Sequence, residues 1–234
     1  MKKFVIDESV FEKLPDYCVG LVVAKGVDNK NVSEKIQNFL DQEVKSFAEK
    51  YADANIREIK NIDACRQAFY QMDMNPNKFM CSIEALAKRA KKNGVLPHIS
   101  TVVDLGNAFS VKYVLPMGAH DIDKCPSDLM VRFAKDGDTF LPLGEEEIEN
   151  VPSGELVYAS GDTVKTRRWI WRQSDDGKIT EESTNLVFPI DGFMNVDKDD
   201  VINARDELAQ MLKAEFSCDV KVGFINKDSN SMEL

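Results

Sequence analysis

The chain has 234 residues, a net charge of −10 at neutral pH, 43% hydrophobic residues and 30% charged residues. A chain of this length buries roughly 70–75% of its unfolded surface, so its fold needs no disulfide or metal for stability. No apolar run approaches the roughly 20 residues that span a bilayer, and the two lysines near the N-terminus precede no apolar segment of a signal peptide. We therefore expect a soluble globular protein with no membrane partner.

Five cysteines occur at wide, irregular spacing, with no C-x-x-C pair. This pattern indicates buried free thiols in a reducing compartment, so we expect a cytoplasmic protein. The chain has only two histidines and no zinc-type cluster, and we expect neither a metal nor a cofactor. The acidic balance argues against DNA and against broad nucleic-acid binding, but it allows a local basic patch that contacts RNA.

The first half of the chain predicts alternating strands and helices. Apolar β-branched runs predict strands at Lys3–Ile6 and Tyr17–Val27. Helical spacing of apolar residues predicts helices at Asn31–Tyr51 and Ile62–Met72, with Ser33 or Asn31 as the cap of the first. Residues 56–59 are a candidate short strand.

A further helix begins at Ser82 and ends at Asn93-Gly94, a left-handed stop signal. Its last turns carry four cations, which either complement the helix dipole or form a phosphate-contacting surface. Residues 100–109 fit a short helix or a turn, and Val111–Leu115 resembles a strand.

The central part contains short apolar segments separated by Gly- and Pro-containing turns. This rhythm predicts a small barrel or meander rather than a parallel sheet with helical crossovers. The candidate strands are Leu129–Ala134, Phe140–Leu143, Glu155–Ala159, Arg168–Trp171 and Asn185–Ile190.

The C-terminal part predicts a helix at Asp199–Phe216 and a strand at Asp219–Ile225. Residues 227–234 are polar and are expected to form a flexible tail. Without repeats or a Pro- or Gly-rich linker, residues 1–226 are expected to form one α+β domain: a mixed or antiparallel, barrel-like sheet of about six strands wrapped by helices.

The segment RRWIWRQ, residues 167–173, is rich in guanidinium groups and indoles. If it is a strand, Arg168 and Arg172 share one face, while Trp169, Trp171 and Gln173 lie on the other. The first face would suit phosphate or carboxylate, and the second would suit stacking of a base. The alternative is a core tryptophan pair flanked by solvent-exposed arginines.

A second polar group surrounds a Pro-Gly turn and is expected to hold the catalytic side chains. The alternative interpretation of these residues is a capped loop. The group consists of Asp104, Asn107, Ser110, His120, Asp121 and Asp123.

No P-loop, dinucleotide-binding glycine motif, nucleophile elbow or H-E-x-x-H motif occurs in the chain. Nucleotide hydrolysis, dinucleotide redox chemistry and triad hydrolysis are therefore disfavoured.

The ordered segments SIEAL, VVDLGN, LPMGAHDID, LMVRFAKDGDTF, GELVYASGD, RRWIWRQS and ITEESTNLVF resemble the B3/B4 domain. This is the tRNA-editing domain of the beta subunit of bacterial phenylalanyl-tRNA synthetase, which also occurs as free-standing proteins. The resemblance covers about residues 81–190. It implies a six-stranded barrel with surrounding helices, and hydrolysis of a mischarged ester by a positioned water rather than by a side-chain nucleophile.

The chain departs from the synthetase at two places. Gly118 stands where the synthetase carries a histidine, with His120 two residues later, and residues 171–174 (WRQS) replace a glycine-rich segment. The synthetase's selectivity for tyrosine is therefore not carried over, and the other synthetase modules are absent from this sequence.

We therefore expect a free-standing editing protein that binds the aminoacylated 3′ end of tRNA, and thus the amino acid, and hydrolyses the ester. Alternatives are a non-catalytic module that binds tRNA or an amino acid, and a hydrolase of an unrelated small ester. The catalytic residues would be Asn107, His120 and Asp121, and the binding residues Arg132, Glu155, Arg168, Trp169, Trp171, Arg172 and Gln173. Among these, Glu155 or Asp121 would pair with the α-ammonium, and Trp169 or Trp171 would stack on the terminal adenine.

Overall fold

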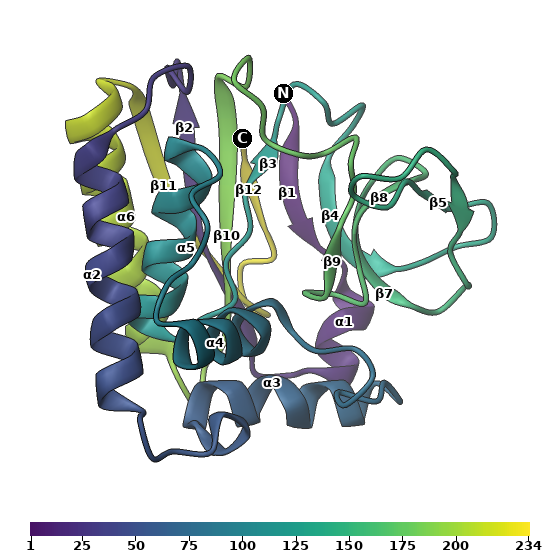
Figure 1. Ribbon diagram of the computed structural model, residues 1–234. Coiled ribbons are helices and arrows are strands. Elements are labelled where there is room, and N and C mark those ends of the chain that lie inside the picture. The colour runs from purple at the N-terminus through teal and green to yellow at the C-terminus, as the bar shows by residue number, and fades with distance from the viewer.

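A computed structural model describes all residues from 1 to 234. It contains six α-helices and two β-sheets, and one face of the smaller sheet is covered by helices (Figure 1). The helices are α1 (Glu8–Lys13), α2 (Glu34–Lys50), α3 (Lys60–Gln71), α4 (Ser82–Asn93), α5 (Thr101–Tyr113) and α6 (Lys198–Phe216).

The smaller sheet has the strand order β11-β2-β10-β3 and is antiparallel throughout. Its centre is the nine-residue pairing of β2 with β10, in which both strands are almost completely buried. Helices α2, α5 and α6 pack on its outer side (Figure 1). The strands are β2 (Tyr17–Lys25), β3 (His120–Asp121), β10 (Asn185–Phe193) and β11 (Asp219–Ile225).

The larger sheet has the order β12-β1-β4-β7-β8-β5-β6, with β9 also paired to β8. It mixes parallel pairs, such as β1 with β4, and antiparallel pairs. Its strands are β1 (Lys3–Ile6), β4 (Leu129–Phe133), β5 (Thr139–Phe140), β6 (Glu149–Asn150), β7 (Leu156–Ser160), β8 (Thr163–Arg167), β9 (Arg172–Gln173) and β12 (Ser231–Glu233).

The main core lies between the two sheets. Phe4 of β1 and Tyr158 of β7 contribute to it from the larger sheet, and Tyr17 of β2 and Val187 of β10 contribute from the smaller one. A second core separates the smaller sheet from its helices, and a third, of six residues, fills the lobe formed by β5 to β8.

The α+β class with a mixed sheet is confirmed, but the expectation of a barrel is wrong. Strands β12 and β6 end one sheet and β11 and β3 end the other, so neither sheet closes on itself. The apolar residues of β2 and β10 lie on both faces of the smaller sheet, one facing the larger sheet and the other facing the helices. The protein therefore forms stacked layers instead of a closed barrel.

Several local expectations also differ from the structure. The strand-like segment Val111–Leu115 belongs mostly to α5, which ends in a left-handed residue at Val114. Residues 56–58 form a 3-10 helix instead of a strand. Strand β8 (Thr163–Arg167) was not expected, because its alternating Thr, Val and Lys residues follow a turn without an apolar run.

The C-terminus also differs from the flexible tail expected for residues 227–234. Strand β12 pairs antiparallel with β1, and the side chain of Leu234 is buried. All five cysteines are free and buried. None of the helices is both long and apolar enough to cross a membrane.

Candidate functional site

A small cavity of about 130 Å³ lies between the two sheets. Strand β10 and the loop before β3 form one side, and β7, β8 and the turn before β9 form the other. Its lining residues are Ser82, Met117, Gly118, His120, Tyr158, Thr166, Trp169, Ile170, Trp171, Gln173, Pro189 and Asp191.

Asp191 is the buried acidic group of this cavity. Its Oδ1 accepts hydrogen bonds from the hydroxyls of Tyr17 and Tyr158, at 2.5 and 2.6 Å, and from Nε1 of Trp169 at 3.1 Å. Burial raises the pKa of Asp191 to about 6, although the three donors act in the opposite direction. The carboxyl is therefore mostly ionised at neutral pH.

His120 is the second ionisable group of the cavity and is 3% exposed. Burial, assisted by the positive charge of Lys165, lowers the pKa of His120 to about 4, so the imidazole is neutral at neutral pH. Its Nδ1 is the only fully enclosed side-chain nitrogen or oxygen in the chain without a hydrogen-bond partner. A Cβ built at Gly118 would lie 3.6 Å from Nε2, so this nitrogen lies next to Gly118 in the cavity wall.

The turn before β9 corrects the expectation that Arg168–Trp171 is a strand with alternating faces. Arg168 and Trp169 both have left-handed backbone conformations, with φ of 46° and 62°. Such conformations cost free energy in residues other than glycine and need support from the surroundings. Here the backbone N–H of Arg168 donates to Glu155, and that of Trp169 donates to the carbonyl of Leu156. This support directs the Trp169 indole into the core.

A larger cavity of about 350 Å³ adjoins the first. The two share Met117, Gly118 and Gln173 in their walls. Asn107, on α5, lines only the larger cavity, as do Arg89 and Lys178. The structure thus places Asn107 and His120 in neighbouring compartments that meet at Gly118 and Gln173.

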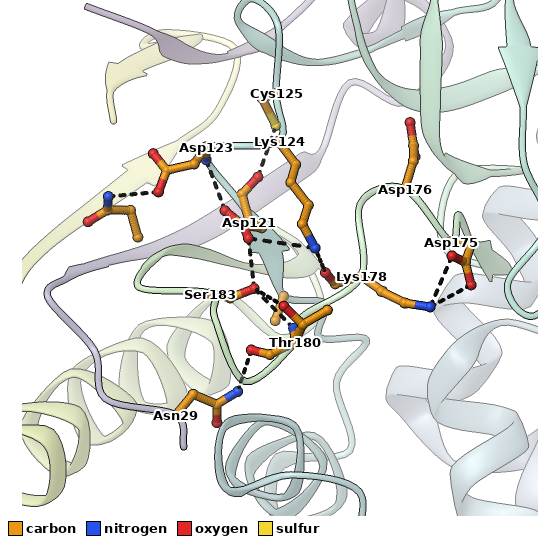
Figure 2. A network of polar contacts seen from close by, with 12 residues as sticks. Asn29, Asp121, Asp123, Lys124, Cys125, Asp175, Asp176, Lys178, Thr180 and Ser183 are labelled. Atoms are coloured by element: carbon orange, nitrogen blue, oxygen red, sulfur yellow. Dashed lines mark hydrogen bonds and ion pairs between the residues drawn. The ribbon is translucent and has the colours of Figure 1, made fainter. Parts of the chain in front are cut away.

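Five of the residues predicted for the site lie outside both cavities: Asp121, Arg132, Glu155, Arg168 and Arg172. Figure 2 shows Asp121, which accepts hydrogen bonds from the Ser183 hydroxyl and from the backbone of Asp123, with Lys124 nearby. It follows His120 on β3 and therefore points to the opposite face of the strand. It is thus a structural carboxylate within the loop network.

Three more of these residues are held by ion pairs. Arg132 makes two hydrogen bonds to Asp138, and Glu155 receives two from Arg167. Arg172 pairs with Glu145 at the surface. Their charges are neutralised by other residues of the chain. The identity of these partners cannot be read from spacing in the sequence.

Of the other predicted residues, Trp169, Trp171 and Gln173 line the small cavity, and Arg168 lies outside it, beside Trp171. Trp169 is completely enclosed, so it has no free face for a base. Trp171 is only partly buried and packs edge-on against Phe79, and the guanidinium of Arg168 lies 3.8 Å from the centroid of the Phe79 ring. Gln173 donates from Nε2 to the carbonyl of Ala119.

Sequence reasoning missed Asp191 and the two tyrosines that bind it. The three residues are far apart in sequence, and only the pairing of β2 with β10 and the facing of the two sheets bring them together. The one available signal was an aspartate inside an otherwise apolar strand, FPIDGF, because a buried carboxylate requires dedicated partners.

No group of three or more side chains is arranged to hold a metal ion. A separate groove of about 390 Å³ lies between α3 and the start of β2, but it contains no histidine, cysteine or tryptophan. The ionisable cavity between the sheets is therefore the better candidate for a functional site.

The layered α+β fold encloses a cavity with buried polar groups between its sheets. A family model described as the B3/4 domain matches residues 64–216, and the chain belongs to this family.

Phenylalanine–tRNA ligase beta subunits of Bacillus cereus and of Bacillus thuringiensis subsp. konkukian are each 32% identical to the chain over 95 residues. The aligned part is 40% of this chain and 11% of each subunit. Among solved structures, an N-terminal fragment of the phenylalanyl-tRNA synthetase beta-subunit from Pyrococcus horikoshii aligns with a TM-score of 0.48 and 12% identity. That alignment covers 93% of this chain and 49% of the fragment, so the chain spans only part of each relative.

Proposed function

We propose that the two adjoining cavities bind the aminoacylated 3′ end of a tRNA, and that the chain hydrolyses the ester that joins the amino acid to it. Membership of the B3/4 family and the similarity to phenylalanine–tRNA ligase beta subunits support a tRNA-related role. The observation that carries the proposal is that one cavity is lined by both a neutral His120 and the buried carboxyl of Asp191.

In this proposal the smaller cavity receives the aminoacyl group and the larger one receives the terminal adenosine. Asn107 lies in the wall of the larger cavity, where its amide can bind ribose or base. Trp171 keeps accessible surface but lines only the smaller cavity, so in this arrangement it would contact the aminoacyl group rather than the adenine. Gln173 borders both compartments, so the ester would lie beside it.

The reaction would use a positioned water. His120 Nε2, which lies beside Gly118 in the wall of the smaller cavity, can hold a water next to the ester carbonyl. The water oxygen forms a bond to the carbonyl carbon, its proton passes to solvent or to the imidazole, and the C–O bond to the ribose breaks with protonation of the leaving hydroxyl. The products are a free amino acid and an uncharged tRNA.

Cations near the larger cavity would contact the phosphates of the tRNA end. Arg89 lines it and Lys92 follows Arg89 on the last turn of α4, whereas Lys178, which also lines it, is paired with Asp175. The net charge of −10 requires that any such contact be local.

The test is deacylation of a panel of mischarged tRNAs by the purified chain, compared with His120→Ala. We expect turnover of at least one member and a loss of about 100-fold or more in kcat/KM in the variant, the range typical of lost acid–base or positioning groups. His98→Ala is the matched control, because His98 binds Asp104 and lines neither cavity. A flat panel, or equal loss in both variants, would reject the proposal.

The low pKa of His120 supports one alternative, a module that binds the tRNA end without hydrolysing it, because an imidazole with a pKa of about 4 is a weak base. A flat deacylation panel combined with tRNA binding that weakens steeply with salt would favour this alternative.

A further inference from the structure

The two oxygens of Asp191 have different surroundings. Oδ1 accepts hydrogen bonds from Tyr17, Tyr158 and Trp169, whereas Oδ2 accepts none from the protein. Only His120 Nδ1 is both fully enclosed and without a partner. Because Asp191 lines the small cavity, Oδ2 must open into it.

An oxygen in this position favours a ligand with a hydrogen-bond donor. A buried carboxylate oxygen without a donor carries a desolvation cost of about 1–3 kcal/mol or more. Tyr17, Tyr158 and Trp169 already donate to Oδ1, so they fix the orientation of the carboxyl group and leave Oδ2 for the contents of the cavity. An apolar group beside Oδ2 would leave this cost unrelieved, whereas a hydroxyl would remove it.

The position of the carboxyl limits the length of such a ligand. The backbone N–H of Gly118 donates to the carbonyl of Pro189, so Gly118 lies opposite Pro189 on β10. Asp191 is two residues further along the same face of the strand, about 7 Å away. An ester held at Gly118 and Gln173 would therefore place Asp191 within reach of a hydroxyl on the β-carbon of the amino acid. The hydroxyl of a tyrosine would extend beyond it.

The volume of the cavity leads to the same limit. At about 130 Å³ it is smaller than the roughly 150 Å³ cavity known to take a benzene molecule. Its walls are the large side chains of Tyr158, Trp169 and Trp171 together with Pro189. These walls therefore favour a side chain of two or three heavy atoms over an aromatic ring.

Building on the proposed function, we propose that Asp191 determines specificity, and that the cavity selects small hydroxyl-bearing amino acids, serine or threonine, over alanine and valine, which lack the hydroxyl, and over tyrosine. The hydroxyl donates to Oδ2 while the ester lies at Gly118 and Gln173, near His120 Nε2. A site built to hydrogen-bond a hydroxyl rejects the analogue that lacks it by factors that reach about 10⁴–10⁵.

The experiment compares hydrolysis of one tRNA body charged with serine, threonine, alanine, valine or tyrosine. We expect kcat/KM for the seryl ester to exceed that for the alanyl ester, or kcat/KM for the threonyl ester to exceed that for the valyl ester, by at least about 100-fold. In Asp191→Asn, whose amide oxygen still accepts the three donors, this ratio should fall to within about tenfold. Asp123→Asn is the matched control and should keep the full ratio, because Asp123 binds Asn185 outside the cavity.

The outcomes separate this inference from the proposed function. Equal hydrolysis within each pair, or fastest hydrolysis of the tyrosyl ester, would overturn the inference and leave the editing function intact. If no ester is hydrolysed, the specificity inference is tested instead by measuring the binding of non-hydrolysable 3′-amino-adenosine amides of serine and alanine. Tighter binding of the seryl amide that disappears in Asp191→Asn would support the inference, and equal or absent binding would overturn it.

Discussion

The ring of Tyr158 stacks on the imidazole of His120, with ring centroids 5.6 Å apart and planes inclined by 18°. The hydroxyl of the same tyrosine donates to Asp191 at 2.6 Å. One side chain of β7 therefore contacts both ionisable groups of the cavity, one through its face and the other through its hydroxyl.

Tyr158→Phe should separate these two contacts. The stacking surface remains, but Asp191 loses one of its three donors, which should lower the free energy of unfolding by about 1–3 kcal/mol. Urea denaturation measures this change. Tyr17→Phe is the matched control. It also removes a donor to Asp191 Oδ1, but Tyr17 does not line the cavity. If binding of the aminoacyl end depends on Asp191 alone, both variants should weaken it similarly; a loss confined to Tyr158→Phe would instead implicate the wall of the cavity.

Asp191→Asn should change how stability depends on pH. Burial raises the pKa of Asp191 to about 6, above the roughly 3.9 of an unfolded aspartate. The native state therefore binds more protons between pH 4 and pH 6, and the contribution of Asp191 to the free energy of unfolding falls as pH rises through this window. The variant, which cannot titrate there, should gain up to about 3 kcal/mol relative to the wild type between pH 4 and pH 7.

Denaturation at several pH values measures this difference. The pKa of Asp197 is also raised to about 6, but its effect is present in both proteins and cancels. A constant difference between the two proteins across the window would show that Asp191 is not titrating there.

Arg132→Ala should destabilise the fold without a specific effect on tRNA affinity. Arg132 and Asp138 form a buried ion pair, and removing one partner leaves the other uncompensated, at a cost of about 3–5 kcal/mol. Replacing both, as Arg132→Met with Asp138→Leu, should recover most of that loss. Thermal unfolding measures both variants. Weaker tRNA binding by the stable double variant would restore the sequence-based role of Arg132 in binding.

Leu234→Ala should lower stability by about 2–3 kcal/mol. The side chain is buried in the main core, and its backbone N–H donates to Lys2, so it fastens β12 to the edge of the larger sheet. Asp228→Ala, at an exposed turn position, is the control and should have little effect. Equal unfolding midpoints for the two variants would mean that the last residues behave as the tail expected from their polarity.

Much of the framework could be predicted from the sequence, because its signals are local. β1 and β11 have the expected bounds, and α2 and α6 differ by only a few residues, since apolar periodicity and caps such as Ser33 define them. The turn at Arg168-Trp169 could not be predicted, because two bulky residues in left-handed conformations contradict local preference and depend on Glu155 and Leu156 for support.

The candidate site was only partly predictable for a similar reason. His120 and Gln173 stood out by residue type and do line the small cavity. The residue types of Arg132 and Glu155 also suggested a role in the site, but ion pairs with other residues of the chain neutralise their charges in the fold. Asp191 was missed because its significance comes from Tyr17 and Tyr158, which lie on other strands.

The five buried free cysteines provide the chain with internal probes of local opening. They lie in or next to different elements: β2, α3, α4, the loop before β4, and the end of α6. A thiol-reactive reagent can reach each sulfur only when its surroundings open, so the rate at which each cysteine is modified reports the opening free energy of that region. Cys81, which immediately precedes the cavity residue Ser82, would reveal whether the cavity wall loosens before the β2–β10 core that holds Cys18.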